Sequence, residues 1–466
     1  MIELLNNIIV KDIYRTNKDV LSIEDINLYI KLYESQINRF KTLQSYYEGR
    51  HKILDKEVKS DIPNNKIINA YPKYITDTQT GYFLGQPIAY SANDHTTTAD
   101  DKLLEKLLDI FKLNDEQEEN IEIAKTCSIK GVCYEIMWID KDTNVRFKLI
   151  QPDEVFLVYD DTLEENVKFA VRFYDTVVDK EKIRHINVYD DTTVKLYEGK
   201  SGSIVLVDEK EHNFKGVPVI QYENNKEHRG DFEPVLSLID AYDSAQSNTL
   251  NDMDQFTDAY LVLVNMLGTE SEDIEALKEK RTLLLDSDGD AKWLIKDIND
   301  SWVENYKNRL KADIHKFSFT PDMSDENFGA NLSGVSLSYK LLGMEHLRAN
   351  KERKFKKALQ RRIELICNVL KITNSELEYT GIDIKFNNSL PQNILELTQI
   401  IQNLSPYLST ETLIEQLPFV ESAKEEMDKK EKEEQEKSEE DYSKLESMFK
   451  FKNKNTDEKV VEEDEE

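Results

Sequence analysis

The pattern of apolar positions predicts helical segments on either side of a β-rich centre. Residues 22–48 open with Ser22 and, three positions later, Asp25, which is typical of a helix-capping box, and they continue with apolar residues at helical spacing. Over residues 131–222 the chain changes to eight short runs rich in β-branched and aromatic residues, such as GVCYEIMWI and VKFAVRFY, separated by turns such as DKDTN and EGKSG. We therefore predict an early helix followed by an antiparallel β region.

Helical spacing returns in the second half of the chain. A helix is predicted over about 235–264, and between Asp240 and Asp258 it carries five aspartates and no basic residue. We expect these aspartates to form an acidic face. A second amphipathic helix is predicted over about 302–315, and the short extended segment after it ends near Pro321.

A third helix is predicted from Gly334 to about Ile372, and it would be roughly 55–60 Å long at about 1.5 Å per residue. Between Lys340 and Glu364 it carries nine basic residues against three acidic ones. Two explanations are open: the basic side chains pair with acidic surfaces of a neighbouring subunit, or they contact nucleic acid directly. The candidates for either role are Lys340, Arg348 and Lys351.

The composition limits the classes of function. The 466 residues include 91 acidic and 61 basic ones, which gives a net charge of −30. The acidity is not confined to the Glu- and Lys-rich stretch 431–466, which we expect to be disordered or to form a solvated helical extension. Nonspecific affinity for nucleic acid comes from cations that displace counterions from phosphates. A chain this acidic should not coat nucleic acid, so any contact with DNA must be local or weak.

Signals for redox chemistry and targeting are sparse. The chain has three cysteines, and Cys127 and Cys133 have no neighbouring metal-type partners, so we interpret them as small buried side chains in a reducing compartment. No apolar run approaches the roughly 20 residues that span a bilayer. The first residues include no basic leader. We expect a cytoplasmic protein with no membrane partner.

The stretch SDENFGANLSGVSL, residues 324–337, is close to a phosphate-binding loop. Gly329 and Gly334 have the required spacing, but Val335 stands where the motif needs lysine, and no strand leads directly into the first glycine. A flexible link that caps the following helix is the better interpretation. DSDGD at 286–290 fits a turn better than a calcium loop, and the histidines are scattered. We predict no catalytic residue, no cofactor and no metal site.

Four segments resemble, in the expected order, the portal proteins of tailed bacteriophages with long non-contractile tails. They are YYEGRHKI (46–53), NNKIINAYPKYITDTQTGYFLGQPI (64–88), FEPVLSLIDAYDSAQSNTLNDMDQFTDAYLVL (232–263) and FTPDMSDENFGANLSGVSLSYKLLGMEHLRANKERKFKKALQRR (319–362). Similarity to this family implies an α+β portal fold and a ring, usually of twelve subunits, around a central channel at one vertex of the procapsid. DNA is packaged and ejected through that channel, and ATP hydrolysis belongs to the terminase, so no enzyme activity is expected.

The resemblance also implies an order of regions and a set of partners. The regions are a wing (1–236), a stem helix (237–266), a clip (267–300), a second stem helix (301–319), a tunnel loop (320–336), a long helix (337–372), a wing strand (373–391), a helical crown (392–430) and an acidic tail (431–466). The expected partners are further copies of the chain, double-stranded DNA, the terminase large subunit, the head-completion adaptor, the scaffolding protein and the major capsid protein. The expected location is the virion, with assembly in the host cytoplasm.

By this resemblance the glycine-rich stretch matches the tunnel loop. The expected DNA-channel residues are Asn327, Gly329, Asn331, Ser333 and Gly334. Uncharged side chains can hydrogen-bond a sliding phosphate backbone without gripping it, and aspartates on the stem helices would repel phosphates. Two alternatives stay open: a degenerate nucleotide-binding motor component, and a coiled-coil scaffold, which the long helix and charged tail suggest.

Overall fold

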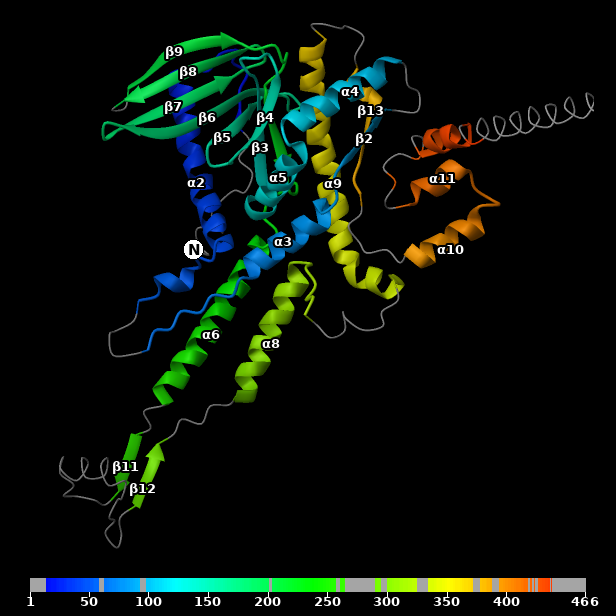
Figure 1. Ribbon diagram of the computed structural model, residues 1–466. Helices are drawn as coiled ribbons and strands as arrows, with labels where there is room; N and C mark the ends of the chain where they lie inside the picture. The colour runs from blue at the N-terminus through cyan, green and yellow to red at the C-terminus, as the bar shows by residue number, and fades with distance from the viewer. Residues whose placement is uncertain are drawn as a thin grey trace, which may run out of the picture. The chain divides into compact units, whose positions relative to one another are not determined.

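The computed structural model describes residues 14–57, 63–92, 98–200, 203–256, 260–264, 290–294, 300–324, 334–371, 378–387 and 394–417, and beyond them 420, 423, 426–435 and 437. The chain forms two compact units (Figure 1). The first consists of residues 1–85 and 96–381, and the second of residues 86–95 and 382–466. Helices and mainly antiparallel sheets are mixed along the chain, which confirms the α+β class.

A six-stranded sheet is the largest β element of the first unit. Its strand order is β1-β5-β6-β7-β8-β9, and neighbouring strands are antiparallel except for β1, which pairs parallel with β5. The predicted antiparallel β region is therefore confirmed. The strands are β1 (Tyr14–Arg15), β5 (Val155–Tyr159), β6 (Val167–Val178), β7 (Glu181–Tyr189), β8 (Thr193–Lys200) and β9 (Ser203–Glu211).

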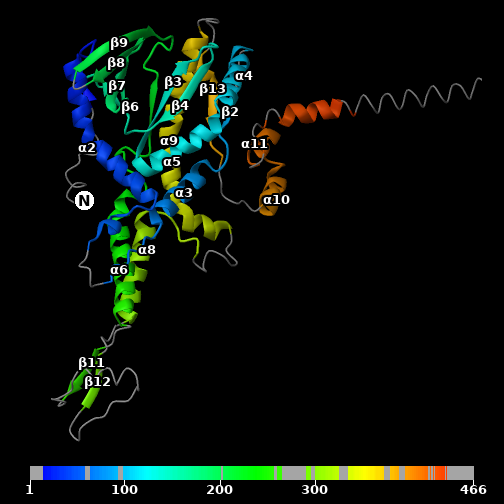
Figure 2. The ribbon, with the colours of Figure 1, turned by 60° about the vertical axis from the view of Figure 1, so that its left-hand side comes forward.

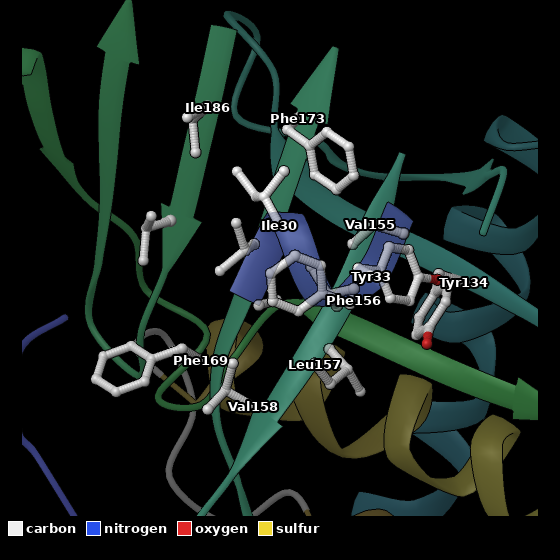
Figure 3. Close-up of a cluster of buried hydrophobic side chains, with 14 of the residues drawn as sticks. Ile30, Tyr33, Tyr134, Val155, Phe156, Leu157, Val158, Phe169, Phe173 and Ile186 are labelled. Atoms are coloured by element: carbon white, nitrogen blue, oxygen red, sulfur yellow. The ribbon is translucent and has the colours of Figure 1, made fainter. Parts of the chain in front are cut away.

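Helix α2 (Ile23–Tyr47) packs against this sheet, and the predicted capping box at Ser22 is present (Figure 1). The apolar positions of the helix meet those of the sheet in one buried cluster. Figure 3 shows its centre, where the ring of Tyr33 lies against the rings of Phe156 and Phe173. Burial of these aromatic rings is the main force that fixes the helix on the sheet.

A second sheet has three antiparallel strands in the order β10-β3-β4, and it contacts helices on either side. Gly131 ends α5 with φ +86°, and a Cβ there would collide with the carbonyl group of His228. Only glycine allows this turn and this close approach of two backbones. The elements are β3 (Val132–Ile139), β4 (Val145–Ile150), β10 (Val219–Glu223), α4 (Thr98–Leu113), α5 (Glu116–Lys130) and the long helix α9 (Gly334–Leu370).

Helices α6 (Leu236–Phe256) and α8 (Asp300–Phe317) lie side by side in both views (Figures 1 and 2). The prediction that the first of them continues to residue 264 is wrong. Tyr260–Val264 instead form β11, which pairs antiparallel with β12 (Asp290–Leu294). The run YLVLV is apolar at every position and therefore fits either period, and its β-branched valines favour the strand.

Among its described residues, the second unit contains a two-stranded sheet, two short helices and a further helical stretch at 426–435, whose end falls in the predicted tail. β2 (Ala89–Ala92) pairs antiparallel with β13 (Ile382–Lys385), although 290 residues separate Ala92 from its partner Ile382. The helices are α10 (Ile394–Leu404) and α11 (Thr410–Glu415). The remaining short elements belong to the first unit and are η1 (Lys52–Asp55), α3 (Tyr71–Leu84), η2 (Glu233–Val235) and η4 (Tyr379–Gly381).

Two further sequence predictions bear on function. All three cysteines are buried and unbridged. Across the described parts of the chain, no helix is both long enough and apolar enough to cross a bilayer. In the predicted clip, 267–300, the structure describes β12 and the first residue of α8, and the rest of that range lies outside the described residues.

Candidate functional site

The candidate site is built from the chain on either side of residues 325–333, which lie outside the described residues. Before them come residues 318–324, which we call the anchor segment. The side-chain amide of Gln79, on α3, donates to the carbonyl oxygen of Ser318 (2.9 Å) and to Oγ1 of Thr320 (3.0 Å). All three residues are buried, so these hydrogen bonds fix the beginning of the anchor segment against α3.

A tyrosine hydroxyl holds the middle of the anchor segment. Tyr74, also on α3, donates to the carbonyl oxygen of Pro321 (2.8 Å) and accepts from the backbone N–H of Met323 (3.1 Å). This hydroxyl thus provides hydrogen-bond partners for one backbone N–H and one backbone carbonyl group, neither of which belongs to a helix or strand.

Asp322 joins the anchor segment to α8. Its carboxylate accepts from Nζ of Lys311 (2.6 Å) and from the backbone N–H and hydroxyl of Ser324 (3.0 and 2.6 Å). Burial alone would raise the pKa of this carboxyl, but the hydrogen bonds from Lys311 and Ser324 outweigh it and lower the pKa to about 2. The carboxylate therefore stays ionised, and the link intact, at neutral and moderately acidic pH.

Gln79 also connects the anchor segment to the long helix. The Nζ of Lys351, on α9, donates to Oε1 of Gln79 (3.1 Å) and forms an ion pair with Asp231. Ser128 donates to the same carboxylate (2.5 Å). Lys351 is only 7% exposed, so its charge is used inside the chain. A contact with DNA or another subunit is therefore unfavourable for Lys351, because the buried ammonium would have to leave Asp231 and Gln79 to make it.

The other two basic candidates lie nearer the surface. Arg348 donates to Glu345 (2.7 Å) and to Glu352 (2.9 Å), which are neighbours on the same helix. Lys340 is exposed in the first turns of α9. Ion pairs within the chain therefore neutralise much of the positive charge that the sequence places on this helix. Of the three candidates, Lys340 has the most accessible side chain.

One ionic cluster of α9 lies almost completely buried beside the three-stranded sheet. The guanidinium of Arg362 donates to both carboxylate oxygens of Glu135, on β3 (2.9 and 2.7 Å), and to Glu116 on α5 (3.1 Å). It also donates to Oδ1 of Asn120 (2.9 Å) and lies 4.6 Å from the ring centre of Phe147. All the charged members are buried, so the cluster fixes the position of α9 on α5 and the sheet.

Polar residues of α6 bind a segment far away in the sequence. Residues 64–69, which we call the strap, run beside α6 (Figure 1). The backbone N–H groups of residues 65, 67 and 69 donate to side-chain oxygens of Asn251 (2.6 Å), Ser247 (2.9 Å) and Asp243 (2.8 Å), respectively. Alternate residues of an extended chain lie about 6.5 Å apart, and residues four apart on a helix lie about 6 Å apart, so the two spacings match.

We call these three hydrogen bonds between the strap and α6 the ladder. The one at Asp243 lies in fully buried surroundings. Besides the backbone of Asn69, Asp243 contacts Nδ1 of His51 (2.5 Å), and both side chains are fully buried. The His51 ring stacks on Tyr46 with 4.7 Å between ring centres, and the Tyr46 hydroxyl donates to Asp240 (2.6 Å). The predicted acidic face of α6 is therefore wrong for Asp240 and Asp243, because their carboxylates bind groups of the same chain.

The structure locates only part of the predicted tunnel-loop site. Asn327, Gly329, Asn331 and Ser333 lie outside the described residues, and Gly334 is the first residue of α9. The sequence analysis did not identify Gln79, which connects the anchor segment to α9. A signal was present, because Thr76, Gln79 and Thr80 are polar positions that point into the interior of an otherwise apolar helix face.

The role of Tyr74 in the anchor segment can be tested with Tyr74→Phe. The substitution removes two hydrogen bonds to backbone, and we expect the free energy of unfolding to fall by about 1–2 kcal/mol. Amide hydrogen exchange at Met323 should become faster, because its N–H loses its acceptor. Tyr47→Phe is a matched control, since that hydroxyl bonds to exposed Asp77. Unchanged exchange at Met323 would contradict the assigned role.

The class of protein follows from the family model that the chain matches, which is that of the phage portal proteins. Residues 26–440 match the family described as phage portal protein, SPP1 Gp6-like, and the chain belongs to this family. The family is structural rather than enzymatic, and its members are located in the virion capsid. In the described residues, no group of three or more His, Cys, Asp and Glu side chains is arranged to hold a metal ion.

Two named relatives extend over most of the chain. The portal protein of Bacillus phage SPP1 is 26% identical over 425 residues, which cover 85% of this chain and 81% of the relative. The portal protein of Clostridium phage phiCD119 is 23% identical over 437 residues, which cover 87% of this chain and 94% of the relative. A solved structure titled as the neck of an empty GTA particle, computed with C6 symmetry, covers 74% of this chain and 88% of its own at 13% identity, with a TM-score of 0.44. The assignment rests on the family match and not on this structural similarity.

Proposed function

We propose that copies of this chain form a closed ring around a channel at one vertex of the procapsid, and that double-stranded DNA enters and leaves through it. The observation that carries this proposal is the family match over residues 26–440. The ring would bind the terminase large subunit during packaging and the head-completion adaptor afterwards, with the scaffolding protein and major capsid protein around it. The chain would act as a conduit and docking platform, and ATP hydrolysis would be left to the terminase.

We infer a correspondence between the regions of a portal protein and the elements of this chain. We assign the wing to residues 1–236 with the strand at 373–391, the stem to α6 and α8, the clip to the segment that includes the β11–β12 hairpin, the long helix to α9 and the crown to residues 392–430. The acidic tail would be 431–466. On this assignment the strap and the anchor segment both brace the stem helices against the wing.

The tunnel loop would be residues 320–336, with Asn327, Gly329, Asn331, Ser333 and Gly334 facing DNA. The anchor segment supports this proposal, because Gln79, Tyr74 and Asp322 hold the chain firmly up to residue 324. Residues 327–334, which carry no charge, can touch a moving phosphate backbone through weak contacts that form and break easily, whereas Asp325 and Glu326 before them would repel phosphates. Lys340, near the loop, is the basic residue that we propose for a DNA or intersubunit contact.

Deleting residues 326–334 tests the loop assignment. Ring assembly, measured by electron microscopy of the purified protein, should be unchanged, because the bonds of the anchor segment lie outside the deletion. DNA packaging or retention, measured by complementation of a portal-deficient phage, should be strongly impaired. Loss of the ring itself would mean that the segment is structural and would contradict the assignment.

A further inference from the structure

In its middle turns, helix α9 has one buried side and one exposed side. The buried side consists of Lys351, Phe355, Ala358, Leu359 and Arg362. At about 100° per residue, these five positions fall within roughly a third of the helix circumference. The helix packs against β10 and α3 (Figure 1), and the opposite side is the one that a partner could reach.

Three basic side chains lie on the exposed side, and we call Arg353, Lys356 and Lys357 the basic face. Arg353 and Lys357 are exposed, and Lys356 is half-buried. The other positions on this side, 349, 350 and 360, are alanine, asparagine and glutamine. Over residues 349–360 the exposed side of α9 therefore carries three positive charges and no negative charge.

Carboxylates of the chain do not neutralise the basic face. Arg353 donates to the uncharged side chain of Asn350 (3.3 Å). Among the residues that the structure describes, none places a carboxylate within ion-pair distance of Lys356 or Lys357. The three charges are therefore left over after the ion pairs of α9 have formed.

Three glutamates near the basic face have cations of their own. The ion pairs are Glu352 with Arg348 (2.9 Å), Glu364 with Arg361 (2.8 Å) and Glu223 with Lys354 (2.5 Å). Lys357 also borders a groove of about 430 Å³, where three basic side chains stand beside Glu164, Glu165 and Glu223. Arg353 and Lys356 do not line this groove. An anion is therefore favoured on the exposed side of the helix and not in the groove, where the charges balance.

The surface of α9 around the basic face is also poor in apolar groups. Along residues 343–370, all of which the structure describes, no large apolar side chain is exposed. The core of a protein–protein interface is apolar and rich in aromatic residues, whereas interfaces with DNA are polar and positively charged. The basic face thus fits nucleic acid better than it fits a neighbouring copy of the chain.

We propose that the basic face binds the phosphate backbone of double-stranded DNA. This inference rests on the proposed channel, and it adds to that channel a set of residues that touch DNA. Arg353 and Lys357 are four residues apart, which is about 6 Å along the helix axis. Each DNA strand carries one phosphate per about 3.4 Å of its axis, so a helix that lies along a strand would bring these two side chains to alternate phosphates.

The small number of contacts agrees with the composition of the chain. Three phosphate contacts per subunit are few, and the chain as a whole has a net charge of −30. Binding of this kind is local and weak, and it breaks easily when DNA moves.

The triple variant Arg353→Gln, Lys356→Gln, Lys357→Gln tests the inference. Glutamine has a high helix propensity, so the variant should stay folded, with a thermal midpoint near that of the wild type. Binding of a labelled DNA duplex to the full-length protein, measured by fluorescence anisotropy in about 50 mM salt, should weaken about tenfold or more. The slope of log affinity against log salt concentration should become shallower by about three, one for each lost phosphate contact.

A matched control removes the same charge from another helix. Lys102, Lys106 and Lys112 are exposed on α4, and their replacement by glutamine should leave the affinity for DNA nearly unchanged. The conservative variant Arg353→Lys, Lys356→Arg, Lys357→Arg keeps the three charges and should bind DNA like the wild type. An equal loss of affinity in the α4 control would mean that net charge alone sets the affinity, and it would overturn the inference.

Chemical protection is a second measurement, which uses the wild-type protein and does not depend on the folding of a variant. Lysines are acetylated with and without the DNA duplex, and the modification is quantified by mass spectrometry. DNA should slow acetylation at Lys356 and Lys357 and leave Lys102 and Lys106 unchanged. Equal acetylation of Lys356 and Lys357 in both samples would contradict the inference.

Electron microscopy of the same preparations separates this inference from the proposed function. A triple variant that binds DNA like the wild type but forms no rings would assign the basic face to a contact between subunits, and the inference would be wrong. Wild-type rings that bind no DNA through the basic face would overturn the inference and leave the portal function standing. A wild-type protein that forms no rings would overturn both.

Discussion

Replacing Arg362 with alanine should lower the free energy of unfolding by about 3–5 kcal/mol, because it leaves Glu135 and Glu116 buried without their cation. Denaturation by urea, followed by circular dichroism, would measure the loss. The matched control is Arg353→Ala on the same helix, where the arginine is exposed and donates to Oδ1 of Asn350 (3.3 Å). The control should change the stability by less than about 0.5 kcal/mol.

The pH dependence of this variant provides a second measurement. Burial raises the pKa of Glu135, and Arg362 is the main group that lowers it again. Without the arginine the folded state should hold a proton on Glu135 more tightly, and a raised folded pKa gives stability that is lost as the pH rises. The destabilisation by Arg362→Ala should therefore be smaller at pH 5 than at pH 8. Equal losses at the two pH values would mean that the cluster acts through packing alone.

Replacing Asp243 with alanine should destabilise the protein by about 3 kcal/mol, because three donors lose a buried acceptor. These donors are the backbone and side-chain amides of Asn69 and the ring of His51. Ser247→Ala removes one backbone contact of the same ladder and should cost about 1 kcal/mol. Unfolding by urea would measure both variants.

The control for this ladder is Ser244→Ala, which lies next to Asp243 but lines a cavity between η1 and α6 instead. It should leave stability within about 0.5 kcal/mol of the wild type. Proteolysis adds a local readout, since cleavage within residues 64–69 should be faster in Asp243→Ala than in Ser244→Ala. If the two variants were cut at the same rate, the strap would not depend on the ladder.

The spacing of apolar residues predicted most helices and strands correctly. It failed where contacts between distant residues determine the secondary structure. The capping box at Ser22, the antiparallel β region and the long helix from Gly334 all depend on neighbours in sequence, so spacing was sufficient. The strand Tyr260–Val264 was assigned to a helix, because its apolar run fits both periods and its partner strand lies about thirty residues further on. The spacing of apolar residues within one segment does not reveal which distant segment that segment pairs with.

The loop site was predicted from the resemblance to portal proteins, whereas the exposed charged faces of α6 and α9 were predicted from residue content, which misjudged them. The aspartates of α6 and the lysine at 351 were expected to face outward, because charged side chains usually do. Asp243 and Lys351 are instead buried, each with a partner that is more than a hundred residues away. A single sequence shows that these charged residues are present but not which residues they contact. The burial of Asp243 and Lys351 could therefore not be predicted from it.

The ladder between the strap and α6 also constrains how the chain folds as it is made. Its three bonds join residues that are 174 to 186 positions apart. A ribosome that adds about 5–20 residues per second needs roughly 10–40 s to synthesise that interval. During this time the amides of residues 65, 67 and 69 have no access to their final acceptors. The strap is therefore expected to dock on α6 late in synthesis, after the strands between Val132 and Glu223 have left the ribosome.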